Sequence, residues 1–282
     1  MFKPLAICLA TFCALFNTYA TASEAPSLPT QAIEGATFPT TPPPCTAICV
    51  ADAYNGQQLY AYNETKQGQV ANLQKLVSAL CICESVSPEA PITISPQASQ
   101  QPQIRFQQIR RGETYPCKVL LQAMLMDGYN DICHELAVAA AGSEAAFVDK
   151  MNQKAAELGM LNSRFANSKG LPAEHFSTAQ DMAKAAWHAY KNKQIRQYVD
   201  TAAWDFPLAN GALRRLNNRN KLLVKHAWVN GMITGYNYAA GHCIIATGEH
   251  QGKAAIVVIL GCKNRKQLWA EAERYLSYAL SL

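Results

Sequence analysis

The sequence predicts a layered α/β or α+β fold, in which strands from both ends of the chain meet in one sheet. Strand-like runs occur near the beginning, at residues 47–53 and 57–62, and near the end, at 244–247 and 254–260. Asn55-Gly56 between the first two is a hairpin turn signal. The long middle of the chain has helical periodicity, so we expect an antiparallel sheet flanked by helices, with a helical lobe inserted between its strands.

The helices are predicted from the spacing of apolar residues. Leu73, Leu76, Val77 and Leu80 recur at helical spacing, which predicts a buried helix over 71–83. An amphipathic helix is expected to close the chain at 266–280. Further helices are predicted at 116–141 (broken near Asp127-Gly128), at 145–158 with Gly159 as cap, and at 178–191 with Ser177 or Thr178 as N-cap.

The first 22 residues have the pattern of a secretory signal peptide. Lys3 precedes an apolar run from Pro4 to Phe16, and Ala20-Thr21-Ala22 is a small-x-small cleavage site. The run is too short to span a bilayer as a stable helix. We therefore divide the chain into a signal peptide at 1–22, a leading segment rich in Pro, Thr and Ser at 23–44, and one domain at 45–282. The mature protein is expected in the periplasm or outside the cell, without a membrane anchor.

Eight of the ten cysteines lie beyond the signal peptide. An even number in an exported chain favours disulfides, and we expect at least three bonds, although sequence alone does not give the pairing. A zinc site is the alternative, but the spacings are not those of a paired C-x2-C framework and no H-E-x-x-H occurs. We expect no metal and no cofactor. The eight are Cys45, Cys49, Cys81, Cys83, Cys117, Cys133, Cys243 and Cys262.

The charge pattern argues against a nucleic-acid partner. The formal net charge is +5, and the basic residues are scattered apart from short clusters such as Arg214-Arg215. Nucleic-acid binding favours a basic stripe or face. The pattern therefore indicates an ordinary solvated surface.

Eight segments in a fixed order resemble one enzyme family along about 230 residues of the chain. They include the hairpin Asp52 to Gly56, Ala71 to Leu76, Asn130-Asp131, Asn217 to Leu223 and Thr234-Gly235-Tyr236. The others are Phe147 to Asn152 with Ala156 to Met160, Phe165 to Leu171, and Ser177 to Asp181. In this order they are similar to the serine D-alanyl-D-alanine carboxypeptidases, the low-molecular-mass penicillin-binding proteins.

The resemblance implies the penicillin-binding transpeptidase or β-lactamase-like fold and a site built from three signatures, S-x-x-K, S-x-N and K-T-G. In that chemistry a serine attacks a carbonyl and forms an acyl-enzyme, and a lysine one helical turn later takes its proton. The second serine and the asparagine position the substrate. The K-T-G strand supplies a cation and a hydroxyl for the substrate carboxylate. The C-terminal β-domain and amphipathic anchor of many members are not expected here.

This chain departs from the family at the reacting positions. Asn72 stands where the nucleophilic serine is expected, Gly128 at the first residue of S-x-N, and Ile233 at the lysine of K-T-G. A neutral amide has no proton that a lysine could remove to make a nucleophile. The matching residues that remain are Lys75, Asn130, Thr234 and Gly235.

Three functions are compatible with this pattern. The first is a catalytically inactive homologue whose cleft binds a peptidoglycan stem peptide or a periplasmic protein. The second is a divergent active carboxypeptidase with another nucleophile; Ser78, three residues after Lys75, is one candidate, although it is about two turns from Asn72 and its alternative role is structural. The third is a secreted scaffold that uses another surface. The departures favour the first, so the chain is predicted not to be an enzyme.

Overall fold

The computed structural model describes residue 38 and residues 42–101, 106 and 109–282. The signal peptide predicted at 1–22 and nearly all of the segment at 23–44 lie outside these residues. No helix in the described part of the chain is long and apolar enough to cross a bilayer.

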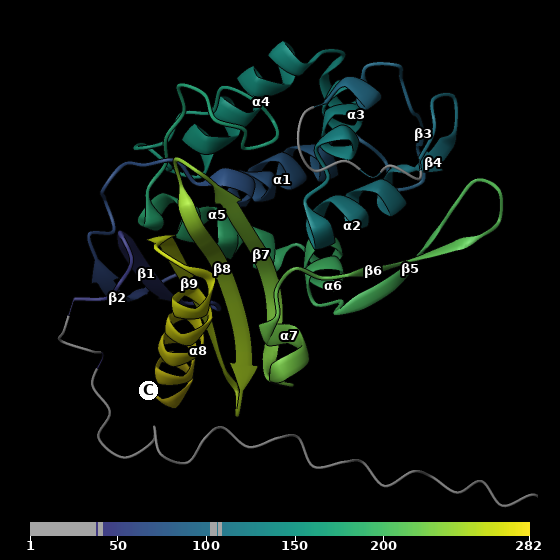
Figure 1. Cartoon of the computed structure of the whole chain (residues 1–282). Helices are drawn as coiled ribbons and strands as arrows, with labels where there is room; N and C mark the ends of the chain where they lie inside the picture. The colour runs from purple at the N-terminus through teal and green to yellow at the C-terminus, as the bar shows by residue number, and fades with distance from the viewer. Residues whose placement is uncertain (1–37, 39–41, 102–105, 107–108) are drawn as a thin grey trace, which may run out of the picture.

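A five-stranded antiparallel sheet joins the two ends of the chain, as the sequence predicts (Figure 1). Its order is β2-β1-β9-β8-β7, so the first hairpin pairs with the last strand through β1 and β9. β7 is one of the two edge strands of this sheet, the one next to the helical lobe. The strands are β1 Ala47–Asp52, β2 Gln58–Tyr62, β7 Val229–Asn237, β8 Gly241–His250 and β9 Lys253–Cys262.

Side chains along the central strands point alternately to the two faces of the sheet, and each face has its own apolar core. Val257 and Ile259 of β9 face helix α8, Arg265–Ser281, which covers one side of the sheet. Ile256 and Val258 point to the other side, where α5 and the helical lobe pack. Successive residues of a strand point to opposite faces, and both faces here are covered, so the strand is apolar throughout.

The helical lobe lies between β2 and β7 in the sequence, as expected. Its residues that matter for the site sit at helix ends: Lys75 begins α1, Asp127 ends α2 and Asn130 begins α3. Gly128 separates α2 from α3 with φ +78°, a left-handed conformation that glycine adopts without the cost of a Cβ. The helices are α1 Lys75–Ser85, α2 Cys117–Asp127, α3 Asn130–Ala141, α4 Glu144–Glu157, α5 Ala179–Lys191 and α6 Lys193–Val199.

Several elements differ from the sequence prediction. The helix expected from residue 71 starts with a 3-10 turn, η2 Ala71–Gln74, because Ala71 has φ +48° and regular α-helix begins only at Lys75. The hairpin of β5 Ala203–Pro207 and β6 Leu213–Asn217 was not predicted; it projects from the body beside α6. The remaining short elements are β3 Pro91–Thr93, η3 Ala98–Gln100, β4 Thr114–Pro116 and α7 Leu222–Lys225.

One disulfide, Cys45–Cys262, ties the start of the domain to the end of β9. The other six cysteines that the structure describes beyond the signal peptide are thiols, so the prediction of at least three disulfides is wrong in number. Five of the six are buried, where cysteine packs as a small apolar side chain. They are Cys49, Cys81, Cys117, Cys133 and Cys243, with Cys83 partly buried.

We expect the double variant Cys45→Ala, Cys262→Ala to lose about 2–4 kcal/mol of unfolding free energy, because the bond closes a loop with a sequence separation of 217 residues. Urea unfolding of both proteins measures the loss. Thiol titration in denaturant should give six reactive thiols in the oxidised mature wild type. A count of two or fewer would mean that further bonds form and that the thiols in this structure are not the native state.

Candidate active site

The first candidate site residue, Asn72, is held between the helical lobe and the edge strand β7. Gly170 packs so tightly here that a Cβ would lie 2.1 Å from the backbone oxygen of Ala71. On the other side, a Cβ on Gly235 would come within 3.0 Å of the Asn72 backbone nitrogen. The two glycines thus allow the loop at Gly170 and strand β7 at Gly235 to approach η2 closely. This fixes Asn72 between the helical lobe and β7.

Lys75 anchors all the parts of this junction. Its ammonium donates to Asn72 Oδ1 at 2.7 Å, Asn130 Oδ1 at 2.8 Å and the Lys169 backbone oxygen at 2.6 Å. The side chain is fully buried, and burial lowers the pKa of Lys75 to about 8, which leaves it protonated at neutral pH. An ammonium group has three hydrogens, and all three are used. In its protonated form Lys75 therefore holds three segments together, with all three of its hydrogens used.

A partly buried acid, Glu144, fixes the loop that carries the Lys169 backbone oxygen. Glu144 contacts Lys169 Nζ at 2.5 Å, Ser168 Oγ at 2.8 Å and His134 Nδ1 at 2.7 Å. Burial raises the pKa of Glu144, but hydrogen bonds from His134 and Lys169 outweigh it and hold the pKa well below its usual range. The carboxylate therefore stays charged and keeps Lys169 in place above Lys75.

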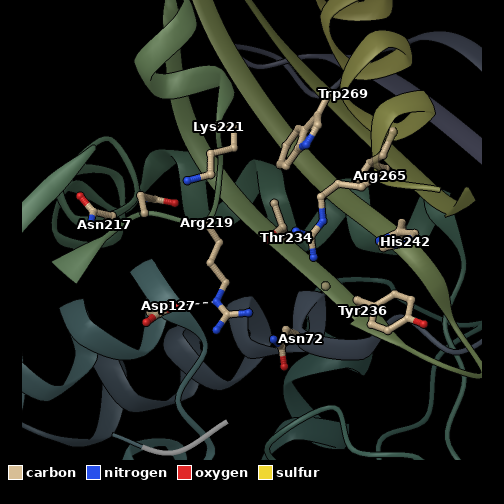
Figure 2. Close-up of a pocket in the computed structure, with 13 residues that line it drawn as sticks. Asn72, Asp127, Asn217, Arg219, Lys221, Thr234, Tyr236, His242, Arg265 and Trp269 are labelled. Atoms are coloured by element: carbon tan, nitrogen blue, oxygen red, sulfur yellow. Dashed lines mark hydrogen bonds and ion pairs between the residues drawn. The ribbon is translucent and has the colours of Figure 1, made fainter. Parts of the chain in front are cut away.

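Asn72 and Gly128 fit each other sterically. A Cβ on Gly128 would lie 2.8 Å from Asn72 Nδ2, closer than real Cβ contacts allow. The Asn72 amide therefore extends into space that a side chain at residue 128 would need. Asn72 is 8% exposed and lies at the bottom of the pocket in Figure 2. Its oxygen faces Lys75, so its NH₂ is left to face the pocket and Gly128.

The three residues of the third motif divide between core and pocket. Thr234 and Gly235 line the pocket from β7. Ile233 is 3% exposed and belongs to the apolar core on the helical side of the sheet, with Met232 as its neighbour. The sequence placed Ile233 among the substrate-binding positions; in the structure it does not line this pocket.

The pocket above Asn72 has a volume of about 380 Å³ and lies between α2, β7 and the first turn of α8 (Figure 2). Pockets of this size accommodate small ligands. Asn72, Thr234 and Gly235 line it, and Trp269 lines the side toward α8. The other lining residues are Asp127, Asn217, Asn218, Arg219, Lys221, Tyr236, His242, Arg265 and Leu268.

Asn218 and Asn220 shape the basic wall of the pocket. Asn218 Oδ1 accepts from the Asn220 backbone N–H at 2.9 Å, and Asn220 Nδ2 donates to the Gly231 oxygen at 2.8 Å. These bonds tie the loop to the start of β7, so the alternate residues Arg219 and Lys221 face the pocket. Arg219 forms an ion pair with Asp127.

The structure gives no support to Ser78 as a nucleophile. Ser78 is fully buried, its hydroxyl donates to the Ser168 backbone oxygen at 2.8 Å, and it does not line the pocket. Sequence reasoning also left Arg219, Lys221, Arg265 and Trp269 without a site role. The resemblance over 217–223 was the one available signal for the first two; no local pattern marks the start of α8 as part of a site. No metal-binding group of His, Cys, Asp or Glu occurs within the described residues.

The buried thiols predict a loss of stability at alkaline pH. Burial raises the pKa of Cys49, Cys81, Cys83 and Cys243 from 9.0 to about 12, and that of Cys117 to about 11. Above pH 9 the unfolded chain releases these protons while the folded chain keeps them, so stability falls as pH rises, by about 1.4 kcal/mol per pH unit for each thiol. Lys75 acts in the opposite direction between pH 8 and 10.5, because its folded pKa is lowered, and offsets about one thiol.

Anaerobic urea unfolding at pH 7.5, 9 and 10.5 measures this slope. The variant Cys117→Ala should reduce it by about 1.4 kcal/mol per unit above pH 9. A stability that is flat between pH 9 and 10.5 would contradict the assignment of these cysteines as buried thiols.

Comparison with known proteins identifies the family. Residues 42–264 match the D-alanyl-D-alanine carboxypeptidase family. The chain is 31% identical over 233 residues to the D-alanyl-D-alanine carboxypeptidase DacF of Bacillus subtilis, covering 80% of this chain and 59% of that protein. It is 29% identical over 236 residues to a D-alanyl-D-alanine endopeptidase of Pseudomonas aeruginosa, covering 80% of this chain and 74% of the relative.

Solved structures agree on the fold. A D-alanyl-D-alanine carboxypeptidase from Mycobacterium tuberculosis superposes with a TM-score of 0.81 at 23% identity, over 89% of this chain and 96% of the other. The carboxypeptidase DacD from Francisella tularensis gives 0.77 at 25% identity, over 84% and 70%. The predicted fold, an antiparallel sheet flanked by helices with an inserted helical lobe, is confirmed. The chain belongs to the D-alanyl-D-alanine carboxypeptidase family.

Proposed function

We propose that this protein is a non-hydrolysing member of its family that binds a peptide with a free C-terminal carboxylate, of the peptidoglycan stem-peptide type. The observation that carries the proposal is the saturated Lys75 ammonium. The group that accepts the serine proton in the family mechanism instead donates to three oxygens, one of them on Asn72. Hydrolysis by this route needs both a nucleophile and a base, and the site offers neither in that form.

The residues that line the pocket support binding of a carboxylate. The Asn72 NH₂ and the Thr234 hydroxyl are neutral donors in a pocket that also contains basic side chains. A carboxylate accepts hydrogen bonds only, so donors and cations are the groups that recognise it. The signal-peptide pattern at residues 1–22 supports a location in the periplasm or outside the cell, where stem peptides occur.

Penicillin and peptide binding test the two halves of the proposal separately. Intact mass after incubation of the mature protein with benzylpenicillin should show no adduct, and a D-Ala-D-Ala-terminated pentapeptide should release no D-alanine. In one serine hydrolase, loss of the nucleophile alone costs on the order of 10⁶ in turnover. The single change Asn72→Ser should leave both measurements at background, because residues 128 and 233 still lack the hydroxyl and the ammonium of the family pattern.

The binding half is measured by calorimetry with the same pentapeptide and its C-terminal amide. We expect the acid to bind at least tenfold more tightly than the amide, because a charge-assisted hydrogen bond contributes about 1.5–3 kcal/mol. A penicillin adduct would show that a nucleophile exists, and peptide mapping would locate it. Equal binding of acid and amide, or none, would leave a scaffold that uses another surface as the function.

A further inference from the structure

The charges around the pocket do not balance when a single carboxylate is placed in it. Three cationic side chains line it, Arg219, Lys221 and Arg265, against one acid, Asp127. Asp127 is taken by Arg219. Lys221 and Arg265 form no ion pair with any residue that the structure describes. One ligand carboxylate would compensate one of these two cations and leave the other unpaired.

The position of Arg265 makes the excess charge more pronounced. Arg265 is the first residue of α8, where the helix dipole is positive, and the first turn contains no acidic residue. A cation at this end of a helix is repelled, whereas an anion is attracted. In Figure 2 the Arg265 side chain, which is solvent-exposed, extends from α8 toward Thr234 at the pocket. Repulsion by Arg265 also contributes, after burial, to the lowered pKa of His242.

A buried donor points into the same space. Asn72 is more than nine-tenths buried, its oxygen is used by Lys75, and no hydrogen bond from its NH₂ is found among the described residues. Trp269 lies one helical turn after Arg265 on the same face of α8, so an aromatic surface adjoins the cation. The pocket therefore combines a buried donor, an aromatic side chain and two exposed cations that have no acidic partner among the described residues.

We infer that the pocket selects peptides with two negative charges: the C-terminal carboxylate and a second free carboxylate on a side chain near it, bound by Lys221 and Arg265. This rests on the proposed function and defines its ligand class. Arg265 is a specificity-determining residue in this scheme, because its planar guanidinium can bind a carboxylate through two hydrogen bonds.

Calorimetry with two pentapeptides that differ only at the residue preceding D-Ala-D-Ala, D-Glu against D-Gln, tests the inference. The wild type should bind the glutamate peptide about tenfold more tightly, in line with one hydrogen bond to a charged group. Arg265→Gln should bind the two peptides equally. Lys266→Gln, one residue along and outside the pocket, is the matched control and should behave as wild type.

A second measurement separates failure of this inference from failure of the proposed function. Trp269 lines the pocket, so its fluorescence reports occupancy by small molecules, with Trp269→Phe as the blank. N-acetyl-D-glutamate should change the signal at lower concentration than N-acetyl-D-glutamine, and Arg265→Gln should remove the difference. Equal affinity of the wild type for both peptides overturns the two-charge preference while leaving peptide binding intact. If neither pentapeptide binds, the proposed function is wrong. If, in addition, N-acetyl-D-glutamate and N-acetyl-D-glutamine give equal responses, the preference for a second carboxylate is wrong as well.

Discussion

Lys75→Met is expected to lower the free energy of unfolding by about 3 kcal/mol or more. The change removes the donor shared by Asn72, Asn130 and the Lys169 backbone oxygen, and leaves three buried acceptors with fewer partners. A buried polar group that loses its partner costs about 1–3 kcal/mol. Opposing this, the variant no longer buries an ammonium group, whose desolvation is unfavourable.

Urea unfolding at pH 7 measures the difference, with Lys266→Met as the control for loss of an exposed lysine of the same size. Amide hydrogen exchange at residues 72, 130 and 169 should speed up together, because one side chain holds all three segments. A variant as stable as wild type would show that the cost of burying the ammonium equals the gain from its three hydrogen bonds, and that Lys75 does not hold the fold together here.

Gly128→Ser is expected to cost about 2–3 kcal/mol in the wild type and about 1 kcal/mol in an Asn72→Ser background. Two effects contribute in the wild type. A side chain at φ +78° is strained by about 1 kcal/mol, and its Cβ would also meet Asn72 Nδ2 at 2.8 Å. Shortening residue 72 to serine removes the second effect and leaves the first.

A double-mutant cycle over residues 72 and 128 isolates this contact as a coupling of about 1 kcal/mol or more. Gly142→Ser is the matched control: Gly142 ends α3 with φ +80°, and a Cβ there meets nothing within 4 Å. Its cost should be the same in both backgrounds. If Gly128→Ser also costs the same in both backgrounds, residues 72 and 128 are not sterically linked, and the two departures from the family pattern are independent.

The coupling bears on how the site came to differ from its relatives. A Cβ at residue 128 would lie 2.8 Å from Asn72 Nδ2, an atom that a serine at residue 72 lacks. Changing only Asn72 to serine therefore leaves a gap beside Gly128, and changing only Gly128 to serine creates a clash with Asn72. Ile233 adds a separate obstacle, because Ile233→Lys alone would place a charge in the apolar core beside Met232.

Local sequence determined much of the fold. The strands at 47–52 and 253–262, the break at Gly128 and the closing helix follow from apolar periodicity, hairpin signals and glycine, which act over a few neighbouring residues. The identity of the residues around Lys75 was also predictable, because the order of the segments resembles one family and each departure falls on a motif position.

Only the tertiary structure decided the rest. The β5–β6 hairpin was missed because its short strands pair mainly with each other and carry a mixed, largely exposed pattern with no clear alternation. Cys45–Cys262 could not be chosen among the possible pairings, because the bond depends on β1 and β9 being neighbours.

The cationic pocket likewise joins residue 72, the 217–221 loop and the start of α8, which are far apart in sequence. The motif positions at residues 72 and 75 were found from sequence because they share one short helical segment. Arg265 was not found, because its role depends on α8 packing against the sheet so that its first turn faces Thr234. A local pattern records propensity and periodicity, whereas a contact between distant segments exists only once the core has formed.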